Sequence, residues 1–470
     1  MGEEGVKFDK WGYQVNTFSD QCISAINEFY DQVLNYGRNM SIILEAPIHD
    51  KNCVLGNTLA ARFSSISHPS QALSFLQSAK SHYDEATDYE KAVFDAISCL
   101  MSEDKDEDDA LELHIKLLKD FPRDLASLKR AQVLCFYMGQ PSPFLDLVQQ
   151  LLPQNEREPY IHGMLAFPLL ELGRMKDAEC AARKALEINN QDVWAQHCLC
   201  HVLQYECRFA EAVQFMEECS PSWSSCSSFM YTHNWWHVAL CYLEGHSPVT
   251  KVLDLYDHRI MTEPDNPDAS GPEVYLNALG LLLRVYIRGE MTLFEDRLKY
   301  LAELVTNKGV WYMEWQLDLL IIWALASTDK LPAAKELLEG LKCRVSNMKD
   351  KKQKKMQRGL YLAEALFEYG RGNDEHALQL MGSKNFDACD YKAIGASDEQ
   401  LDVFNEMWYS LLLNTGQAAK VIELIEKRLK SREGVPFLWR LLEKAYSMMG
   451  REEAIRAADK ANHLESVYFQ

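Results

Sequence analysis

A 34-residue periodicity constrains the fold of this chain more than any other feature. Residues 160–190 predict two helices: the first ends near Gly173, a residue type that caps helices, and the second has small residues at Ala178 and Ala185. Small residues at such positions let paired helices approach closely, as in tetratricopeptide repeats. The same phase recurs every 34 residues, at Ala110, Phe144, Ala178 and Ala212. Phe144 is larger than expected, but four positions in phase still indicate a repeat array.

The repeat predicts an all-α chain, a right-handed α-solenoid of tetratricopeptide-like helix-turn-helix repeats that is irregular at the N-terminus and in the middle. Strand signals are scarce, and residues 12–38 are predicted as one amphipathic helix. Residues 465–470 resemble the remnant of a protease-cleaved tag, so we leave them out of the fold prediction. The predicted segments are irregular N-terminal helices at 1–90, regular repeats at 91–260, a loop at 261–272, and divergent helical pairs at 273–464.

Composition narrows the classes of function. No run of about 18 apolar residues occurs, which excludes a membrane span, and the N-terminus lacks the apolar region of a secretory signal, which predicts a cytoplasmic protein. The 13 cysteines contain no Cys-x-x-Cys pair, so we expect reduced thiols. A formal net charge of −20 argues against binding to a phosphate backbone. We therefore expect a protein or peptide partner, or a small molecule, and neither nucleic acid nor membrane.

Two histidine pairs are the candidate functional residues. His197 and His201, like His233 and His237, are four residues apart, which places each pair on one face of a helix. In the repeat register the first pair occupies positions 5 and 9, which line the concave groove of such arrays. The second pair follows by 36 residues, and the loop at 220–228 is long enough to absorb the two extra residues. The register therefore predicts that all four imidazoles face one groove from adjacent helices.

Four convergent imidazoles could bind a transition metal ion, because neutral imidazole is a common metal ligand. The set would suit Zn, Fe, Ni or Cu, with Zn or Fe as the cofactor candidates and with Asp257 or Glu206 as a completing carboxylate. The alternative is that they are structural, since a histidine in a groove is more often a satisfied polar residue than a ligand. Asn234 resembles the asparagines with which such repeats hold a partner's backbone. The sequence leaves both interpretations open.

Enzymatic chemistry has no support of its own in the sequence. There is no Gly-x-Ser-x-Gly turn, no phosphate-binding Gly-rich loop and no His-Glu-x-x-His helix. We assign no catalytic residue.

Two strings around the histidines resemble the tetratricopeptide repeat protein 38 family. They are Asp192-Val-Trp-Ala-Gln-His-x-x-x-His and His233-Asn-Trp-Trp-His-x-Ala-Leu, and later matching blocks are Leu255-Tyr-Asp and Asp402-Val-Phe-Asn. The resemblance covers residues from about 85 to 430 and implies a cytosolic helical-repeat protein whose biochemical role is poorly defined.

The chain departs from that family at several groove positions. The departures are Gln132-Val133 for His-Asp, Gln204 for Glu, Asn277 for Asp, Leu320 for His, Leu401 for Arg and Ser410 for His. They lower the expectation of turnover. We thus expect an interaction protein that holds a partner segment or ligand in its groove, with a metal-binding protein or metal-dependent enzyme as the alternative.

Overall fold

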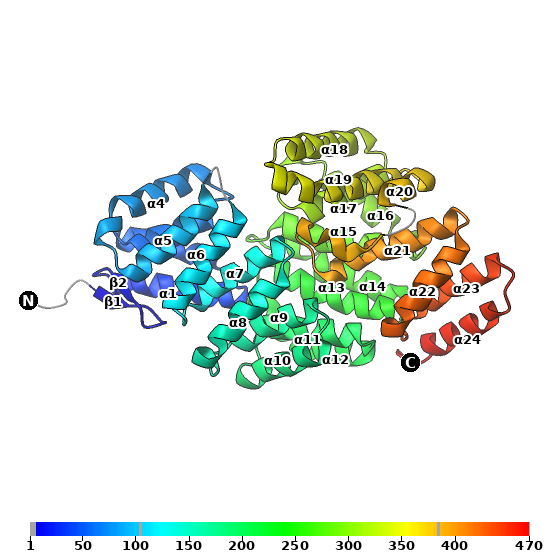
Figure 1. Cartoon of the computed structure of the whole chain (residues 1–470), viewed down its shortest axis with the longest axis horizontal. Coiled ribbons are helices and arrows are strands. Elements are labelled where there is room, and N and C mark those ends of the chain that lie inside the picture. Colours follow the sequence, from blue (N-terminus) through cyan, green and yellow to red (C-terminus); the bar gives the residue numbers. More distant parts are fainter. Residues whose placement is uncertain (1–5, 103–105, 383–385, 470) are drawn as a thin grey trace, which may run out of the picture. The chain divides into compact units, whose positions relative to one another are not determined.

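The computed structural model describes residues 6–102, 106–382 and 386–469 (Figure 1). Within these ranges the chain is helical apart from one short hairpin, in which β1 (Val6–Phe8) pairs antiparallel with β2 (Gln14–Asn16). The all-α helical-repeat fold is therefore confirmed. The chain forms two compact units, residues 1–198 and 199–470, and the boundary falls inside helix α11 (Val193–Tyr205).

The first unit consists of the hairpin and antiparallel helix pairs such as α3 with α4 and α9 with α10. The buried Glu90 ties the hairpin to the helices, because its carboxylate accepts from the backbone N–H groups of Asn16, Thr87 and Leu55. The helices of this unit are α1 (Asp20–Asn35), α2 (Glu45–His49), α3 (Val54–Ser64), α4 (Pro69–Ser81), α5 (Asp88–Met101), α6 (Glu107–Asp120), α7 (Leu125–Tyr137), α8 (Pro141–Asn155), α9 (Ile161–Glu171) and α10 (Met175–Ile188).

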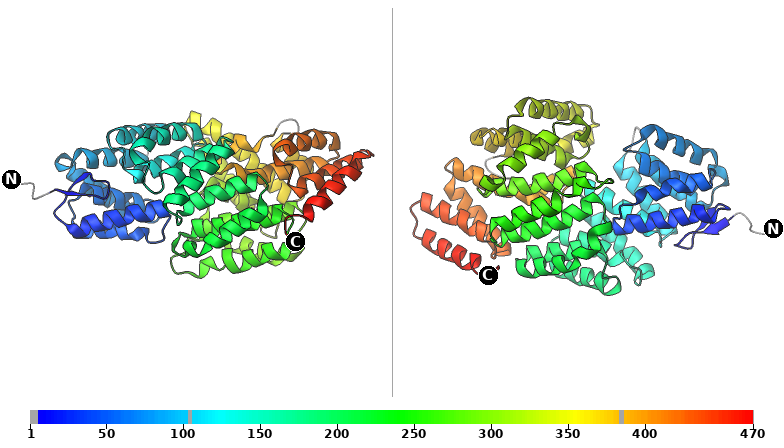
Figure 2. Two further views of the ribbon diagram at one scale, coloured as in Figure 1. Left: turned by 90° about the horizontal axis from the view of Figure 1, so that it is seen from below. Right: turned by 180° about the vertical axis from the view of Figure 1, so that it is seen from behind.

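In the second unit, α13, α15, α17 and α19 pack in succession, and α21 packs against α15 (Figure 2). These elements carry most of the polar side chains discussed below. The helices of this unit after α11 are α12 (Phe209–Cys219), α13 (Ser228–Glu244), α14 (Val249–Leu255), α15 (Gly271–Ile287), α16 (Glu295–Leu304), α17 (Trp315–Ala326), α18 (Leu331–Ser346), α19 (Asp350–Gly370), α20 (Asp374–Met381), α21 (Asp398–Asn414), α22 (Ala418–Arg432), α23 (Pro436–Met448) and α24 (Glu453–Glu465).

The predicted period is visible in the helix starts. The second helices α6, α8, α10 and α12 begin at residues 107, 141, 175 and 209, a constant spacing of 34. The predicted small-residue positions Ala110, Ala178 and Ala212 are fully buried, and Phe144 is also buried. The loop at 220–228 contains the 3₁₀ helix Ser220–Ser225, which takes up the two extra residues before α13.

The prediction of one helix over 12–38 was wrong at its start. The hairpin strand β2 occupies Gln14–Asn16, and α1 begins only after Ser19, whose side chain caps the helix by accepting from the N–H of Cys22. Near the other end of the chain, Tyr468 donates a hydrogen bond to the carbonyl of Gly434, so part of the segment assigned to a tag remnant packs on the second unit. Residue 470 lies outside the described ranges.

None of the helices in the described part of the chain has the length and apolar character needed to span a lipid bilayer. The predicted segment boundaries at 90, 260, 272 and 464 follow the repeat pattern rather than contacts, and they stay a prediction.

Candidate functional site

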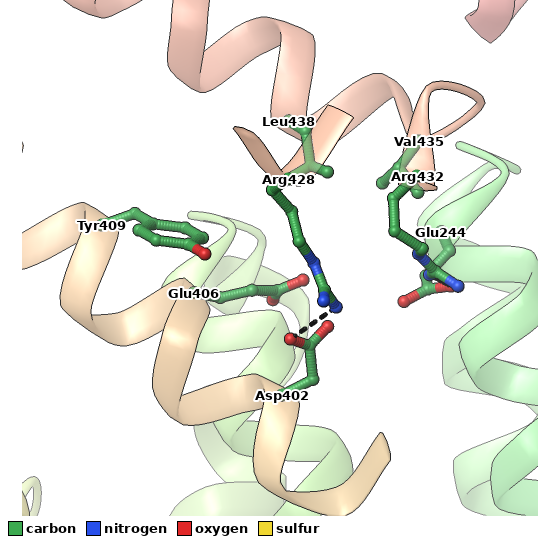
Figure 3. A pocket seen from close by; sticks show the side chains of 8 residues that line it. All are labelled: Glu244, Asp402, Glu406, Tyr409, Arg428, Arg432, Val435 and Leu438. Atoms are coloured by element: carbon green, nitrogen blue, oxygen red, sulfur yellow. Dashed lines mark hydrogen bonds and ion pairs between the residues drawn. The ribbon is translucent and has the colours of Figure 1, made fainter. Parts of the chain in front are cut away.

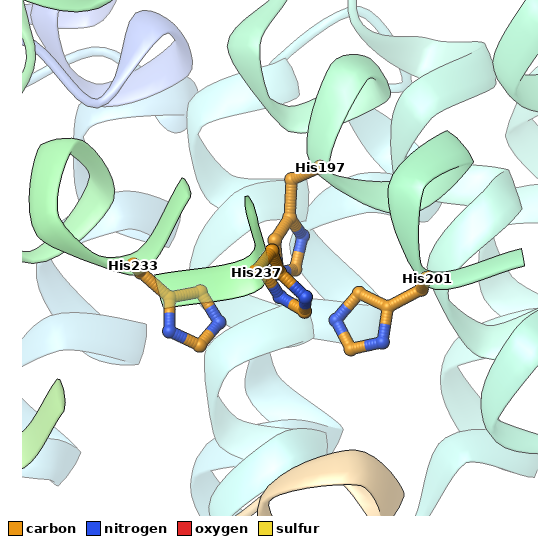
Figure 4. A group of neighbouring side chains, drawn as sticks. All are labelled: His197, His201, His233 and His237. Carbon is orange, nitrogen blue, oxygen red and sulfur yellow. The ribbon is translucent and has the colours of Figure 1, made fainter. Parts of the chain in front are cut away.

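The four histidines come together. One ring nitrogen of each of His197, His201, His233 and His237 lies within 4.8 Å of the others, and Figure 4 shows the four rings gathered around a common centre. His197 is the last residue but one of the first unit, yet it precedes His201 by one turn on the continuous helix α11, so that helix sets the spacing of the pair. All four side chains are buried, so they form an interior cluster, which we call the histidine cluster.

Aromatic rings fix the orientation of His233. Its ring is stacked between those of Phe229, with centroids 4.8 Å apart, and Trp236, at 5.1 Å. The ring of His237 lies edge-on to His233 at 4.7 Å and edge-on to His201 at 4.3 Å. Burial lowers the pKa of His233 to about 3, so this imidazole is neutral at physiological pH.

Asn277 on α15 fixes the tautomer of His233. Thr232 Oγ1 donates to the carbonyl of Ser228 at 2.7 Å and accepts from Nδ2 of Asn277 at 2.8 Å. The same amide nitrogen donates to the carbonyl of Glu273, so the other amide atom, Oδ1, faces Nδ1 of His233 at 2.8 Å. An acceptor at that position requires a proton on Nδ1, which places the lone pair of His233 on Nε2.

Gln204 acts in the same way on His237. Its Nε2 donates to the carboxylate of Glu244 at 3.2 Å, which leaves Oε1 facing Nδ1 of His237 at 3.3 Å. Arg432 holds this arrangement in place by donating to Glu244 at 2.7 Å and to the backbone carbonyl of Gln204 at 2.9 Å. The lone pair of His237 is therefore on Nε2 as well.

Glu399 is the carboxylate of the site. Its Oε2 lies 2.7 Å from Nδ1 of His201 and 3.2 Å from Nδ1 of His237. The residue sits in the first turn of α21, where Ser397 and Gln400 form a capping box and where the helix dipole favours a negative charge. Gly395, with a positive φ of 78°, turns the chain just before this helix. At 14% exposure, the Glu399 side chain is the most open part of the site.

The carboxylates predicted to complete the site do not lie at it. Asp257 forms an ion pair with Arg297 at 2.7 Å, and Glu206 forms one with Arg208 at 3.1 Å. The prediction of Asp257 or Glu206 as the completing group was wrong, and Glu399 takes that position. A signal for Glu399 was present in the sequence, because Ser397-x-x-Gln400 is a capping box that places acidic residues in the first turn.

Asn234 and Arg284 are buried polar residues of the same helices. Asn234 on α13 is fully buried, and neither of its amide atoms has a hydrogen-bond partner among the described residues. Arg284 on α15 is 1% exposed and donates through Nη2 to the backbone carbonyl of Glu399, while Nε and Nη1 have no partner among the described residues. Its guanidinium lies 5.6 Å from the ring of Trp236.

A network of ion pairs adjoins the site in the second unit. Figure 3 shows the small pocket that these side chains line, with Arg428 directed at Asp402 from α22, at 2.8 Å. Burial raises the pKa of Asp402, but the two arginines Arg428 and Arg432 outweigh it and lower the pKa to about 2. Arg288 pairs with Glu406 at 2.6 Å. Since each arginine here faces a carboxylate, the network is a structural support rather than a site for an anion.

These features define a helical-repeat protein of the tetratricopeptide-like class with a polar interior site. No model of a known protein family matches the chain. Among solved structures, the human IFIT1 dimer with m7Gppp-AAAA is 15% identical, covers 93% of this chain and 95% of its own, and has a TM-score of 0.42. IFIT1 with PPP-AAAA is also 15% identical, with 93% and 95% covered and a TM-score of 0.43. At this identity the likeness concerns the fold alone.

The comparison corrects one expectation from the sequence. Chains with related helical repeats have been solved with capped and triphosphate RNA, so the exclusion of a nucleic acid partner on the basis of net charge was wrong. Net charge averages over a whole chain, whereas nucleic acid is bound by the charge of a local surface.

Proposed function

We propose that this chain is a helical-repeat protein that binds a small polar ligand at the interior site of its second unit. The observation that carries the proposal is a pair of buried side chains: both amide atoms of Asn234, and Nε and Nη1 of Arg284, lack partners among the described residues. Leaving a buried polar group unpaired costs about 1–3 kcal/mol, and more for a charged one. A protein that buries two such groups on helices that also carry a polar cluster is expected to pair them with a ligand.

The burial of the site favours a small ligand over an extended partner segment. The four histidines are at most 5% exposed, and Asn234 is fully buried, so a peptide lying on the surface would not reach them. Arg284 offers N–H donors, and Asn234 offers both a donor and an acceptor. The complementary ligand is therefore small, with an acceptor group that Arg284 can bind. A protein or peptide partner and a cytoplasmic location stay predictions from the sequence.

We also propose that the chain belongs to the tetratricopeptide repeat protein 38 family. The support is the residue pattern around the two histidine pairs, in residues 192–201 and 233–240, whose helices also form the site. Two of the departures from the family, Gln204 and Asn277, are the side chains that orient His237 and His233. Each amide keeps the acceptor oxygen of the acid that it replaces, which supports a preserved binding role.

Native mass spectrometry tests the ligand proposal. The intact protein is expected to carry a small molecule of constant mass that disappears on denaturation. Arg284→Met should lose it, whereas Arg297→Met, which removes a partly exposed arginine paired with Asp257, should keep it. The proposal would be contradicted if the wild-type protein carried no small molecule and if no compound in a metabolite screen stabilised it.

Stability measurements separate a binding role from a structural role. Asn234→Leu replaces a buried, unpaired amide with an apolar side chain of similar size. The unfolding free energy of the ligand-free protein is therefore expected to stay constant or to rise by about 1 kcal/mol, while ligand is lost. A loss of several kcal/mol on urea unfolding would instead identify Asn234 as a structural residue.

A further inference from the structure

We infer that the histidine cluster binds a divalent transition metal ion. The inference rests on the proposed function and goes beyond it, since it adds a metal ion at the histidine cluster to the small ligand that Arg284 would bind. It stands on the geometry of the second-unit histidines His201, His233 and His237, with His197 as a further donor one turn earlier on α11.

The tautomers decide which kind of ligand fits. Nδ1 of each of the three histidines faces an oxygen, from Glu399, Asn277 and Gln204 respectively. With the protons on Nδ1, the inward atoms are Nε2 lone pairs, which accept and do not donate. Convergent lone pairs repel an anion such as phosphate or carboxylate and attract a cation with empty orbitals.

The surrounding groups are those that metal sites use. A metal-bound histidine almost always donates its other N–H to a carboxylate, a carbonyl oxygen or water, which orients the ring and raises its basicity. Here one carboxylate, Glu399, serves His201 and His237, while the amide oxygen of Asn277 serves His233. Asn277 and Gln204 are in turn fixed by further hydrogen bonds, to Thr232 and to Glu244. The site therefore has a supporting layer as well as a set of ligands.

The spacing limits the geometry. Opposite ligands of an ion with metal–nitrogen distances near 2.05 Å are about 4.1 Å apart. The nitrogens lie within 4.8 Å of one another, so each has to move by only about 1 Å to reach that distance, or the distance of about 3.3 Å between ligands of a tetrahedral ion. Sulfur is not among the convergent ligand atoms, because the group that the described residues form consists of the four histidines. An all-nitrogen set suits Zn²⁺, Cu²⁺, Ni²⁺ or Fe²⁺.

Metal analysis of the full chain tests the inference. Protein expressed with a non-histidine tag and purified without chelator is expected to contain close to one equivalent of a single transition metal by inductively coupled plasma mass spectrometry. Metal-free protein titrated with Co²⁺ should show saturable visible absorption bands at one equivalent. His258→Ala, which changes an exposed histidine, should behave like the wild type.

Two variants separate metal ligation from a structural role. In His201→Asn and His233→Asn the amide nitrogen takes the place of Nδ1, so the hydrogen bonds to Glu399 and Asn277 can persist while Nε2 is lost. Both variants should keep the wild-type circular dichroism and bind Co²⁺ at least 100-fold more weakly. Glu399→Gln, which alters an orienting residue, should weaken binding by 10–100-fold.

The outcomes distinguish this inference from the proposed function. Co²⁺ affinity that is the same in the wild type and in folded His201→Asn would overturn the metal site. If the native mass spectrum still shows a co-purified molecule that Arg284→Met releases, the ligand-binding proposal survives without the metal. If metal is bound at one equivalent and no organic molecule is found, the metal site stands and the proposal of a ligand at Arg284 fails.

Discussion

Asn277 and Gln204 show how an amide can do part of the work of a carboxylate. Each uses its nitrogen to bind a fixed acceptor, which turns its oxygen toward Nδ1 of a histidine. An aspartate or glutamate would present the same oxygen with a negative charge. Both positions are departures from the residue pattern of the tetratricopeptide repeat protein 38 family, which the sequence resembles. The structure places them at the site with the acceptor retained.

Substitutions at Asn277 test this role. Asn277→Leu removes the acceptor for His233, so Co²⁺ affinity should fall by roughly 10–100-fold. Asn277→Asp keeps the acceptor and adds charge, so affinity should equal or exceed that of the wild type. Competition with a chromophoric chelator measures the Co²⁺ affinity of both variants. Equal affinities in the leucine variant and the wild type would show that His233 needs no orienting partner.

The buried carboxyl group of Asp318 is expected to make the stability of the folded protein depend on pH. Burial raises the pKa of Asp318 to about 7, although its side chain accepts a hydrogen bond from the backbone N–H of Tyr312. In the unfolded chain its pKa is near 3.9. Because the folded-state value is the higher one, the stability contributed by this group is fully present below the unfolded pKa and is lost as pH rises through about 7.

The comparison with Asp318→Asn isolates this contribution. Between about pH 4 and 7 the wild type should lose up to roughly 1.4 kcal/mol per pH unit relative to the asparagine variant. Urea unfolding of both proteins from pH 5 to 8 measures the difference. Parallel pH profiles would show that Asp318 ionises as easily in the folded protein as in the unfolded chain.

At the scale of the helices, the sequence predicted those features that depend on a regular spacing of residues within one segment of the chain. The spacing of 34 anticipated where α6, α8, α10 and α12 begin, and the spacing of four anticipated that each histidine pair shares a face. Glu399 and Asn277 were not predicted as partners of the histidines, because α15 and α21 reach the site only through tertiary packing. Short strands such as Val6–Phe8 were missed because three residues carry too little periodicity.

Helix α22 is joined to α13 by a buried ion pair, and to α11 by a hydrogen bond from Arg432 to the carbonyl of Gln204. Arg432 and Glu244 have side chains only 6% and 5% exposed, and they lie 2.7 Å apart. Arg432→Met leaves a buried carboxylate without its cation and should destabilise the protein by about 3–5 kcal/mol. The double variant Arg432→Met with Glu244→Met removes both charges and should recover most of that loss in urea unfolding. A double variant as unstable as the sum of the single variants would contradict this account.

At the scale of the whole chain, the helical repeats explain the scaffold but not the ligand. IFIT1, which has been solved with m7Gppp-AAAA, is 15% identical to this chain. A shared fold of this kind does not carry function across, because function depends on the residues of the site. Here those residues are buried imidazoles oriented by acceptors, and it is from them that the metal proposal follows.

X-ray absorption spectroscopy of the Co²⁺-loaded protein tests that central claim most directly. An ion held by the histidine cluster should show a first shell of nitrogen or oxygen at about 2.0–2.1 Å, the outer-shell scattering of three or four imidazole rings, and no sulfur near 2.3 Å. His201→Asn should reduce the imidazole signal. A spectrum without imidazole scattering, or one dominated by sulfur, would contradict the account.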